Sequence, residues 1–90
     1  MQRLNVDVEK VLRFKILSRQ SCLWCTRAKM LLNKYDIPFT EKFVTDPKEI
    51  EWLKRQGFKT FPIIYDENEL HIGGYEQLEH YVELFHTLVK

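Results

Sequence analysis

The chain shows two kinds of hydrophobic pattern, and the first of them predicts four β-strands. Residues 11–17 alternate apolar and polar positions over their second half and are rich in branched and aromatic side chains, which is typical of a strand. Shorter segments of strand composition follow at residues 39–45, 61–65 and 70–72. The polar residues 66–69 between the last two segments predict a β-hairpin.

The second pattern, apolar residues three and four positions apart, predicts three helices. These helices cover residues 22–35, 47–56 and 75–89. Ser21 is predicted to cap the first helix, which must end before Pro38. Asp46 is predicted to cap the second helix, with Pro47 in its first turn and Gly57 directly after its end.

The resulting order, β-α-β-α-β-β-α, predicts an α/β fold: a right-handed parallel βαβ unit followed by an antiparallel hairpin. We expect a four-stranded mixed sheet flanked by three helices, with residues 1–90 forming a single domain. Residues 1–10 alternate only briefly and are compatible with an N-terminal arm or an extra edge strand. Ligands of open α/β sheets bind beyond the carboxyl ends of strands, which directs attention to Ser21 and Cys22.

The composition is that of a folded, soluble domain. Hydrophobic residues make up 44% and charged residues 30% of the chain, and no apolar stretch reaches the roughly 20 residues of a membrane span. The net charge of +1 argues against nucleic acid or a membrane surface as the main partner. The first ten residues lack the pattern of a signal or transit peptide, so we expect a cytoplasmic protein.

The only two cysteines, Cys22 and Cys25, form a C-x-x-C motif where a strand gives way to a helix. Such a motif is a redox pair more often than a passive one. Free N–H groups and the helix dipole stabilise an anion there, and Arg19, Arg27 and Lys29 add positive charge. We therefore predict that Cys22 is the nucleophilic thiolate and that Cys25, one turn further in, is the resolving thiol.

Two alternatives to a redox pair start from the same residues. C-x-x-C is also half of a zinc site, and the chain holds His71, His80 and His86. Zinc modules usually place the second ligand pair within about 12–20 residues of the first, which these histidines do not do, so we predict no metal site. The other alternative is a purely structural pair of thiols.

Two further motifs accompany the cysteines. Thr60-Phe61-Pro62 begins the third predicted strand, where a proline is tolerated. The Phe61–Pro62 bond is a candidate for the cis form, although only about 5–6% of such bonds adopt it. Gly73-Gly74 forms either a simple turn or a backbone nest at the start of the last helix, suited to a carboxylate.

Together these motifs resemble the glutaredoxin family of the thioredoxin-like fold. The resemblance covers about residues 11–89 and rests on three motifs in order: Cys22-Leu23-Trp24-Cys25-Thr26-Arg27-Ala28-Lys29, Thr60-Phe61-Pro62, and His71-Ile72-Gly73-Gly74-Tyr75-Glu76-Gln77-Leu78. The small size and the last motif are most similar to phage-encoded glutaredoxins that supply electrons to ribonucleotide reductase.

The resemblance implies the site residues. Cys22 is implied to be the nucleophile, Cys25 the resolving thiol and Pro62 a cis proline facing them. The implied anchors of glutathione are Arg19 and Lys59 for its glycine carboxylate, the backbone of Phe61 for its cysteinyl part, and Gly74, Tyr75 and Glu76 for its γ-glutamyl end.

Two departures from the family pattern bear on activity. Leu23 and Trp24 stand where the family commonly has Pro-Tyr, and Glu76 stands where Asp or Ser is usual. The restored N–H of Leu23 could point toward the sulfur of Cys22, which would alter the reduction potential while leaving the chemistry unchanged.

The predicted function is glutathione-dependent thiol–disulfide oxidoreduction by a monomer. Its substrates are expected to be protein disulfides and protein–glutathione mixed disulfides, with glutathione as co-substrate and ribonucleotide reductase as a candidate partner. One alternative is a thioredoxin-type reductant recharged by a flavoprotein, although Ser21 rather than Trp precedes Cys22. Another is an iron–sulfur scaffold in which Cys22 of two chains and two glutathiones hold one [2Fe–2S] cluster.

Overall fold

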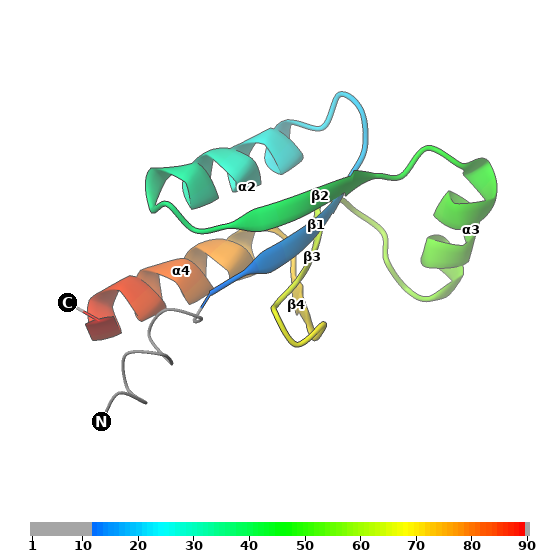
Figure 1. Ribbon diagram of the computed structural model, residues 1–90. Coiled ribbons are helices and arrows are strands. Elements are labelled where there is room, and N and C mark those ends of the chain that lie inside the picture. The colour runs from blue at the N-terminus through cyan, green and yellow to red at the C-terminus, as the bar shows by residue number, and fades with distance from the viewer. Residues whose placement is uncertain (1–11, 90) are drawn as a thin grey trace.

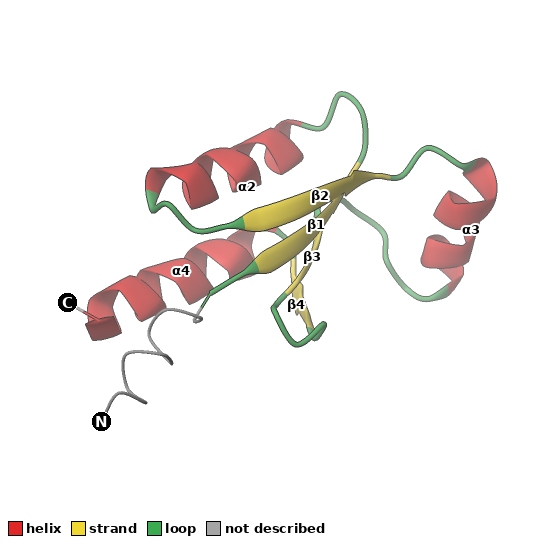
Figure 2. Ribbon diagram, viewed as in Figure 1, coloured by secondary structure: helices red, strands yellow, loops and turns green. Residues whose placement is uncertain are grey.

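The fold follows the predicted order of strands and helices (Figures 1 and 2). The computed structural model describes residues 12–89. Its strands are β1 (Phe14–Ser18), β2 (Phe39–Phe43), β3 (Ile63–Tyr65) and β4 (His71–Gly73), and its helices are α2 (Leu23–Lys34), α3 (Pro47–Arg55) and α4 (Tyr75–Val89). The prediction for residues 1–10, an arm or an extra edge strand, lies outside the described residues.

The four strands form one mixed sheet in the order β2-β1-β3-β4. β1 pairs in parallel with β2, to which α2 connects it, and pairs antiparallel with β3. β3 and β4 form the predicted antiparallel hairpin, with a register shift at Ile64 and Tyr65. The four-stranded mixed sheet with its parallel βαβ unit is therefore confirmed.

Each face of the sheet carries its own hydrophobic core. Successive residues of a strand point to opposite sides, so one strand contributes to both cores. Phe14 and Ile16 of β1 lie in a core with residues of α2, β3 and α4, namely Ala28, Leu32, Ile64, Leu78 and Val82. Leu17 belongs to a second core that contains Val44, Leu53 and Ile63 and includes the buried residue of α3. Figure 2 shows α3 well separated from α2 and α4.

Several strand ends differ from the predicted ones. β3 begins at Ile63 rather than Phe61, since Pro62 has no N–H to contribute to a sheet ladder. β4 covers residues 71–73 rather than 70–72, because the N–H of Leu70 donates to the Asp66 carboxylate at 3.0 Å within the turn. β1 and β2 cover residues 14–18 and 39–43 rather than 11–17 and 39–45.

The predicted cap of α2 was wrong by one residue. Cys22, not Ser21, is the N-cap, and its sulfur accepts a hydrogen bond from the N–H of Cys25. Ser21 instead adopts a left-handed conformation with φ of 57°, which few residues other than glycine and asparagine favour. The loop at residues 19–21 thereby turns the chain so that a sulfur occupies the capping position.

Both predicted ends of α3 are confirmed. The carboxylate of Asp46 accepts from the N–H of Lys48 at 2.9 Å, and Pro47 occupies the first helical position. Gly57 has φ of 99° after the last turn, a conformation that glycine adopts without a Cβ clash. None of the helices within residues 12–89 is long and apolar enough to cross a membrane.

Candidate active site

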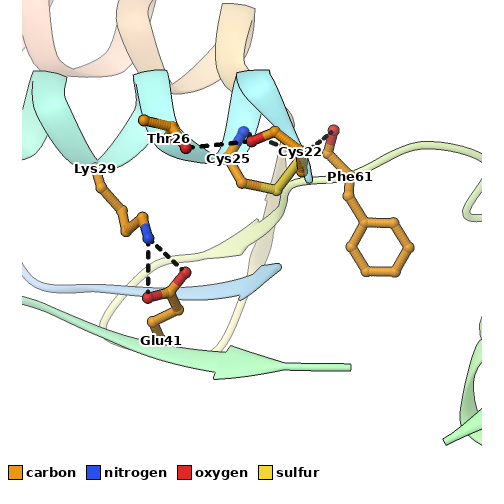
Figure 3. Close-up of a disulfide and its surroundings, with 6 residues drawn as sticks. All are labelled: Cys22, Cys25, Thr26, Lys29, Glu41 and Phe61. Carbon is orange, nitrogen blue, oxygen red and sulfur yellow. Dashed lines mark hydrogen bonds and ion pairs between the residues drawn. A yellow bond between two sulfur atoms is a disulfide. The ribbon is translucent and has the colours of Figure 1, made fainter. Parts of the chain in front are cut away.

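The two cysteines lie where β1 ends and α2 begins, and a disulfide bond joins them (Figure 3). Their Cα atoms are 5.3 Å apart, within the usual range for a disulfide bridge. The C-x-x-C spacing produces this distance because Cys25 is one turn into the helix that Cys22 caps. The structure thus shows the oxidised form of the pair.

The sulfur of Cys22 is the accessible end of the pair. Cys22 is half-buried, whereas Cys25 is only 2% exposed and lies with Ala28 on the buried face of α2. The N–H of Cys25 donates to the Cys22 sulfur over 3.2 Å, and the carbonyl oxygen of Phe61 lies 3.7 Å from that sulfur. Cys22 is therefore the more accessible of the two cysteines.

The first turn of α2 favours a negative charge on the Cys22 sulfur. The N–H of Thr26 donates to the Cys22 carbonyl at 3.2 Å, while the N–H groups of Leu23 and Trp24 have no partner among residues 12–89. This turn contains no acidic side chain. Free N–H groups together with the helix dipole stabilise a thiolate at such a position.

Two of the predicted cations lie against aromatic rings near the cysteines. The guanidinium of Arg19 is 5.6 Å from the centre of the Phe61 ring, and that of Arg27 is 4.9 Å from the Trp24 ring. Arg19 also lines a hollow that Cys22 shares. These contacts hold positive charge at the rim of the site.

The third predicted cation is paired. The Lys29 ammonium lies 2.9 Å from a carboxylate oxygen of Glu41 on β2 (Figure 3). The Glu41 carboxylate offsets the charge of Lys29, so Lys29 contributes less to the positive field at Cys22 than the sequence predicted. The pairing of Lys29 with Glu41 was not predicted from the sequence.

A groove runs from the Cys22 side of the site to the start of α4. This Pro62 groove has a volume of about 320 Å³ and is lined by Trp24, Thr60, Phe61, Pro62, Gly74, Tyr75, Glu76 and Gln77. The Phe61–Pro62 peptide bond is cis, which the resemblance implied and the base rate alone did not favour. The motifs that were far apart in the sequence thus meet at one groove.

The start of α4 is partly capped from within. The N–H of Gly74 donates to the Gln77 side-chain oxygen at 2.9 Å, an interaction typical of a Gln three residues after an N-cap. Gly73, directly ahead of this cap, has φ of 128°, a backbone conformation that glycine adopts without a Cβ clash. The three-residue spacing of Gly74 and Gln77 is itself a signal for such a cap, although this cap was not predicted.

The predicted glutathione anchors fall into two groups. Five of them line the Pro62 groove: Phe61, Pro62, Gly74, Tyr75 and Glu76. Arg19 lines a separate hollow that both cysteines also line. Lys59 is exposed in the segment between α3 and β3 and lines neither of these hollows.

Sequence reasoning missed the role of Trp24 in shaping the groove. The Trp24 ring lies 5.2 Å from that of Tyr75 at 45°, so one wall of the groove joins α2 to α4. Trp24 remains 47% exposed. Its replacement of the family's common Tyr was noted, but a contact between two helices cannot be read from that position alone.

Two of the three histidines considered as zinc ligands pack against aromatic rings. His71 packs edge-on against Phe58, with ring centres 4.8 Å apart, and the ring of His86 lies 5.0 Å from that of Tyr35. Within residues 12–89, no group of three or more His, Cys, Asp and Glu side chains could hold a metal ion.

A mixed sheet with helices on both faces, a C-x-x-C disulfide at the start of α2 and a cis proline beside it define a thiol–disulfide oxidoreductase of the thioredoxin-like class. The glutaredoxin family model matches residues 14–72. The chain belongs to the glutaredoxin family, and Cys22 and Cys25 are its redox-active pair.

Individual relatives agree with this assignment. Glutaredoxin 3 of Escherichia coli K12 is 35% identical over 66 residues, which cover 71% of this chain and 78% of the relative. Glutaredoxin 1 from Francisella tularensis has a similar fold, with a TM-score of 0.72 over 86% of this chain and 99% of that one at 22% identity. NrdH-redoxin from Escherichia coli, described as a glutaredoxin-like protein with a thioredoxin-like activity profile, superposes with a TM-score of 0.59, 26% identity and coverage of 72% and 86%.

Proposed function

We propose that this protein reduces disulfides at the expense of glutathione. The observation that carries the proposal is that Phe61 belongs to both parts of the site: its carbonyl oxygen lies 3.7 Å from the Cys22 sulfur, and it lines the Pro62 groove. A tripeptide bound along that groove would have its cysteinyl sulfur beside Cys22. The groove volume of about 320 Å³ is suited to part of a small peptide.

The proposed anchors stretch glutathione between three points. The backbone of Phe61 would bind its cysteinyl part, and Gly74, Tyr75 and Glu76 would hold its γ-glutamyl end at the start of α4, where the helix dipole favours a carboxylate. The N–H of Gly74 is already bonded to Gln77, so the binding of a carboxylate would depend mainly on the following N–H groups.

The glycine carboxylate of glutathione would be bound by Arg19 and Lys59. Both side chains are exposed and positively charged. Arg19 is the better placed of the two, because it lies against the Phe61 ring, directly beside the proposed position of the cysteinyl part.

The proposed reaction starts from the reduced pair. The Cys22 thiolate attacks a disulfide, and a sulfur–sulfur bond forms between Cys22 and one half of the substrate while the other half leaves as a thiolate. Cys25 or a second glutathione then attacks this mixed disulfide and releases the bound half. We expect the substrates to be protein disulfides and protein–glutathione mixed disulfides, processed by a cytoplasmic monomer.

A second candidate is a thioredoxin-type reductant, which a flavoprotein would recharge instead of glutathione. The observation that favours it is the structural similarity to NrdH-redoxin, whose activity profile is described as thioredoxin-like. Ribonucleotide reductase, which the resemblance to phage-encoded glutaredoxins suggested, is the candidate protein partner. The proposed anchors for the two ends of glutathione favour the first candidate. A protein that a flavoprotein recharges needs no binding site for a tripeptide.

The two candidates are separated by the source of electrons. We expect NADPH and glutathione reductase to sustain turnover of a glutathionylated substrate when glutathione is present, and thioredoxin reductase with NADPH to sustain little. The Cys22→Ser variant provides the blank for both assays. Turnover with thioredoxin reductase alone, and none with glutathione, would overturn the proposal in favour of the second candidate.

A further inference from the structure

An ion pair lies beside the redox site, on the side opposite the Pro62 groove. The Lys29 ammonium is 3.2 Å from Oε1 and 2.9 Å from Oε2 of Glu41. The side chains of Lys29 and Glu41 are only 28% and 18% exposed, and Oε2 itself is buried. A half-buried pair of this kind is screened less by salt than a surface pair.

The ion pair shares a hollow with both cysteines. This hollow, here called the Lys29 hollow, has a volume of about 600 Å³ and is lined by Arg19, Gln20, Ser21, Cys22, Leu23, Cys25, Thr26, Lys29, Glu41 and Phe43. Figure 3 shows Lys29 descending from α2 and Glu41 rising from β2 beside the disulfide. The Pro62 groove does not contain either member of the ion pair.

The Lys29–Glu41 ion pair lies on the same side of α2 as Cys25. Lys29 follows Cys25 by four residues on α2, and residues with this spacing lie on the same face of a helix. Glu41 is next to Ile16 in the parallel register, and Ile16 packs in the core that includes α2. The Lys29 ammonium and the Glu41 carboxylate therefore lie between the sheet and the helix face that carries Cys25.

The other charged group that lines this hollow is Arg19, which lies over the Phe61 ring at the Cys22 end. Lys29 is thus the cation on the helix face that carries Cys25, and Glu41 is the only carboxylate among the residues that line the hollow.

We propose that the Lys29–Glu41 ion pair controls the second step of disulfide reduction: Lys29 stabilises the Cys25 thiolate that attacks the mixed disulfide, and Glu41 limits this effect by holding the ammonium. Lys29 and Glu41 are positioning residues that act on the reactivity of Cys25. The proposal rests on the thiol–disulfide exchange in the proposed function, but it does not depend on glutathione.

The second step is a thiol–disulfide exchange within the protein. Cys25 loses its proton to solvent in the hollow, and its sulfur attacks the sulfur of Cys22. The Cys22–Cys25 bond forms, the bond from Cys22 to the substrate sulfur breaks, and the electron pair leaves on the substrate thiolate, which takes a proton from solvent. A cation beside Cys25 raises the fraction of its thiolate, which is the attacking species.

The test uses dithiobis(nitrobenzoate) in a single turnover with the reduced protein at neutral pH. Attack by Cys22 releases the first coloured thionitrobenzoate, and attack by Cys25 on the resulting mixed disulfide releases the second. The first phase depends on reagent concentration and the second does not, so the two thiols are measured separately in one experiment. The first phase also shows whether Cys22 keeps its reactivity in each variant.

The two residues should move the second phase in opposite directions. We expect Lys29→Gln to slow it by about three- to tenfold and Glu41→Gln to speed it by about two- to fivefold, with the first phase changed by less than roughly twofold. Lys29→Arg, which keeps the charge, should retain most of the rate. A pair that only ties α2 to β2 would not give a faster second phase on loss of Glu41.

The chain offers a matched control on the same strand. Lys42, next to Glu41 on β2, pairs with Glu49 at 3.0 Å, and it follows Glu41 on a strand whose side chains alternate between faces. Lys42→Gln removes the same charge and should leave both phases unchanged. An unchanged second phase in both Lys29→Gln and Glu41→Gln, or a slower one in both, would overturn the proposal. Failure of glutathione to sustain turnover would leave this result untouched.

Discussion

The ring of Trp24 lies 5.2 Å from the ring of Tyr75, and this contact connects the helix that carries the cysteines to the helix that begins at the double glycine. Both rings line the Pro62 groove. Because the groove wall is built from two helices, a change in either residue should affect ligand binding without touching the sulfur chemistry.

Replacement of Trp24 by Ala should raise the glutathione concentration needed for half-maximal turnover. An aromatic contact of this type is worth about 0.5–1.5 kcal/mol, which corresponds to roughly a two- to twelvefold change. Steady-state kinetics over a range of glutathione concentrations measures the effect. Trp52→Ala, which removes a 53% exposed indole from α3, is the control, and an equal effect of both substitutions would contradict the role of Trp24.

The sulfur of Cys22 should react as a thiolate at a lower pH than a free cysteine. This sulfur accepts a hydrogen bond from the N–H of Cys25 at 3.2 Å, and it caps a helix whose first turn has no acidic residue. Both features stabilise the thiolate. The rate of alkylation by iodoacetamide across a pH series, in the Cys25→Ser variant, gives the pKa of Cys22. A midpoint at or above about 8.5 would show that the helix start has no such effect.

Loss of either cationic anchor should weaken glutathione binding while leaving the fold intact. For Arg19→Ala and Lys59→Ala we expect a cost on the order of 1–2 kcal/mol each, or roughly five- to thirtyfold in affinity. Arg19 should show the larger effect, because it lies against the Phe61 ring. Lys48→Ala, which removes an exposed lysine of α3, is the charge-matched control. Unchanged glutathione dependence in both anchor variants would mean that the carboxylate is bound elsewhere.

The two cysteines should separate in paired assays. Cys22→Ser removes the accessible nucleophile and should abolish every disulfide reaction. Cys25→Ser should retain activity on a glutathionylated protein, since a second glutathione releases the mixed disulfide, but lose activity on a protein disulfide. There the substrate stays tethered to Cys22, and the neighbouring Cys25 is the fastest group to release it. Equal loss on both substrates would show that Cys25 has a further role.

Gly73 should be far less tolerant of a side chain than Gly57. Both have a left-handed backbone, with φ of 128° and 99°. A Cβ on Gly73 would lie 2.6 Å from Cγ of Gln77, whereas a Cβ on Gly57 would meet nothing within 4 Å. We expect Gly57→Ala to lower the free energy of unfolding by about 1 kcal/mol and Gly73→Ala by about 2–4 kcal/mol. Urea unfolding measures both, and equal losses would contradict the clash with Gln77.

Interactions between near neighbours in the chain could be predicted from the sequence. The spacing of Cys22 and Cys25 brings two sulfurs together across one helical turn, and Asp46, Pro47 and Gly57 bound α3 through contacts within a few residues. The order of strands and helices follows from the same local periodicity. These features do not depend on what packs against them, so the pattern of residue types is sufficient.

The contacts that shape the site were decided by tertiary structure. Lys29 and Glu41 are separated by 12 residues, and they pair because the parallel register of β1 and β2 sets Glu41 beneath α2. Trp24 meets Tyr75 only because α2 and α4 pack on the same core. Cys22 caps α2 in place of Ser21, because Ser21 adopts a left-handed conformation in the loop after β1. Residue type fixes which groups can interact, but the relative placement of strands and helices selects the partners.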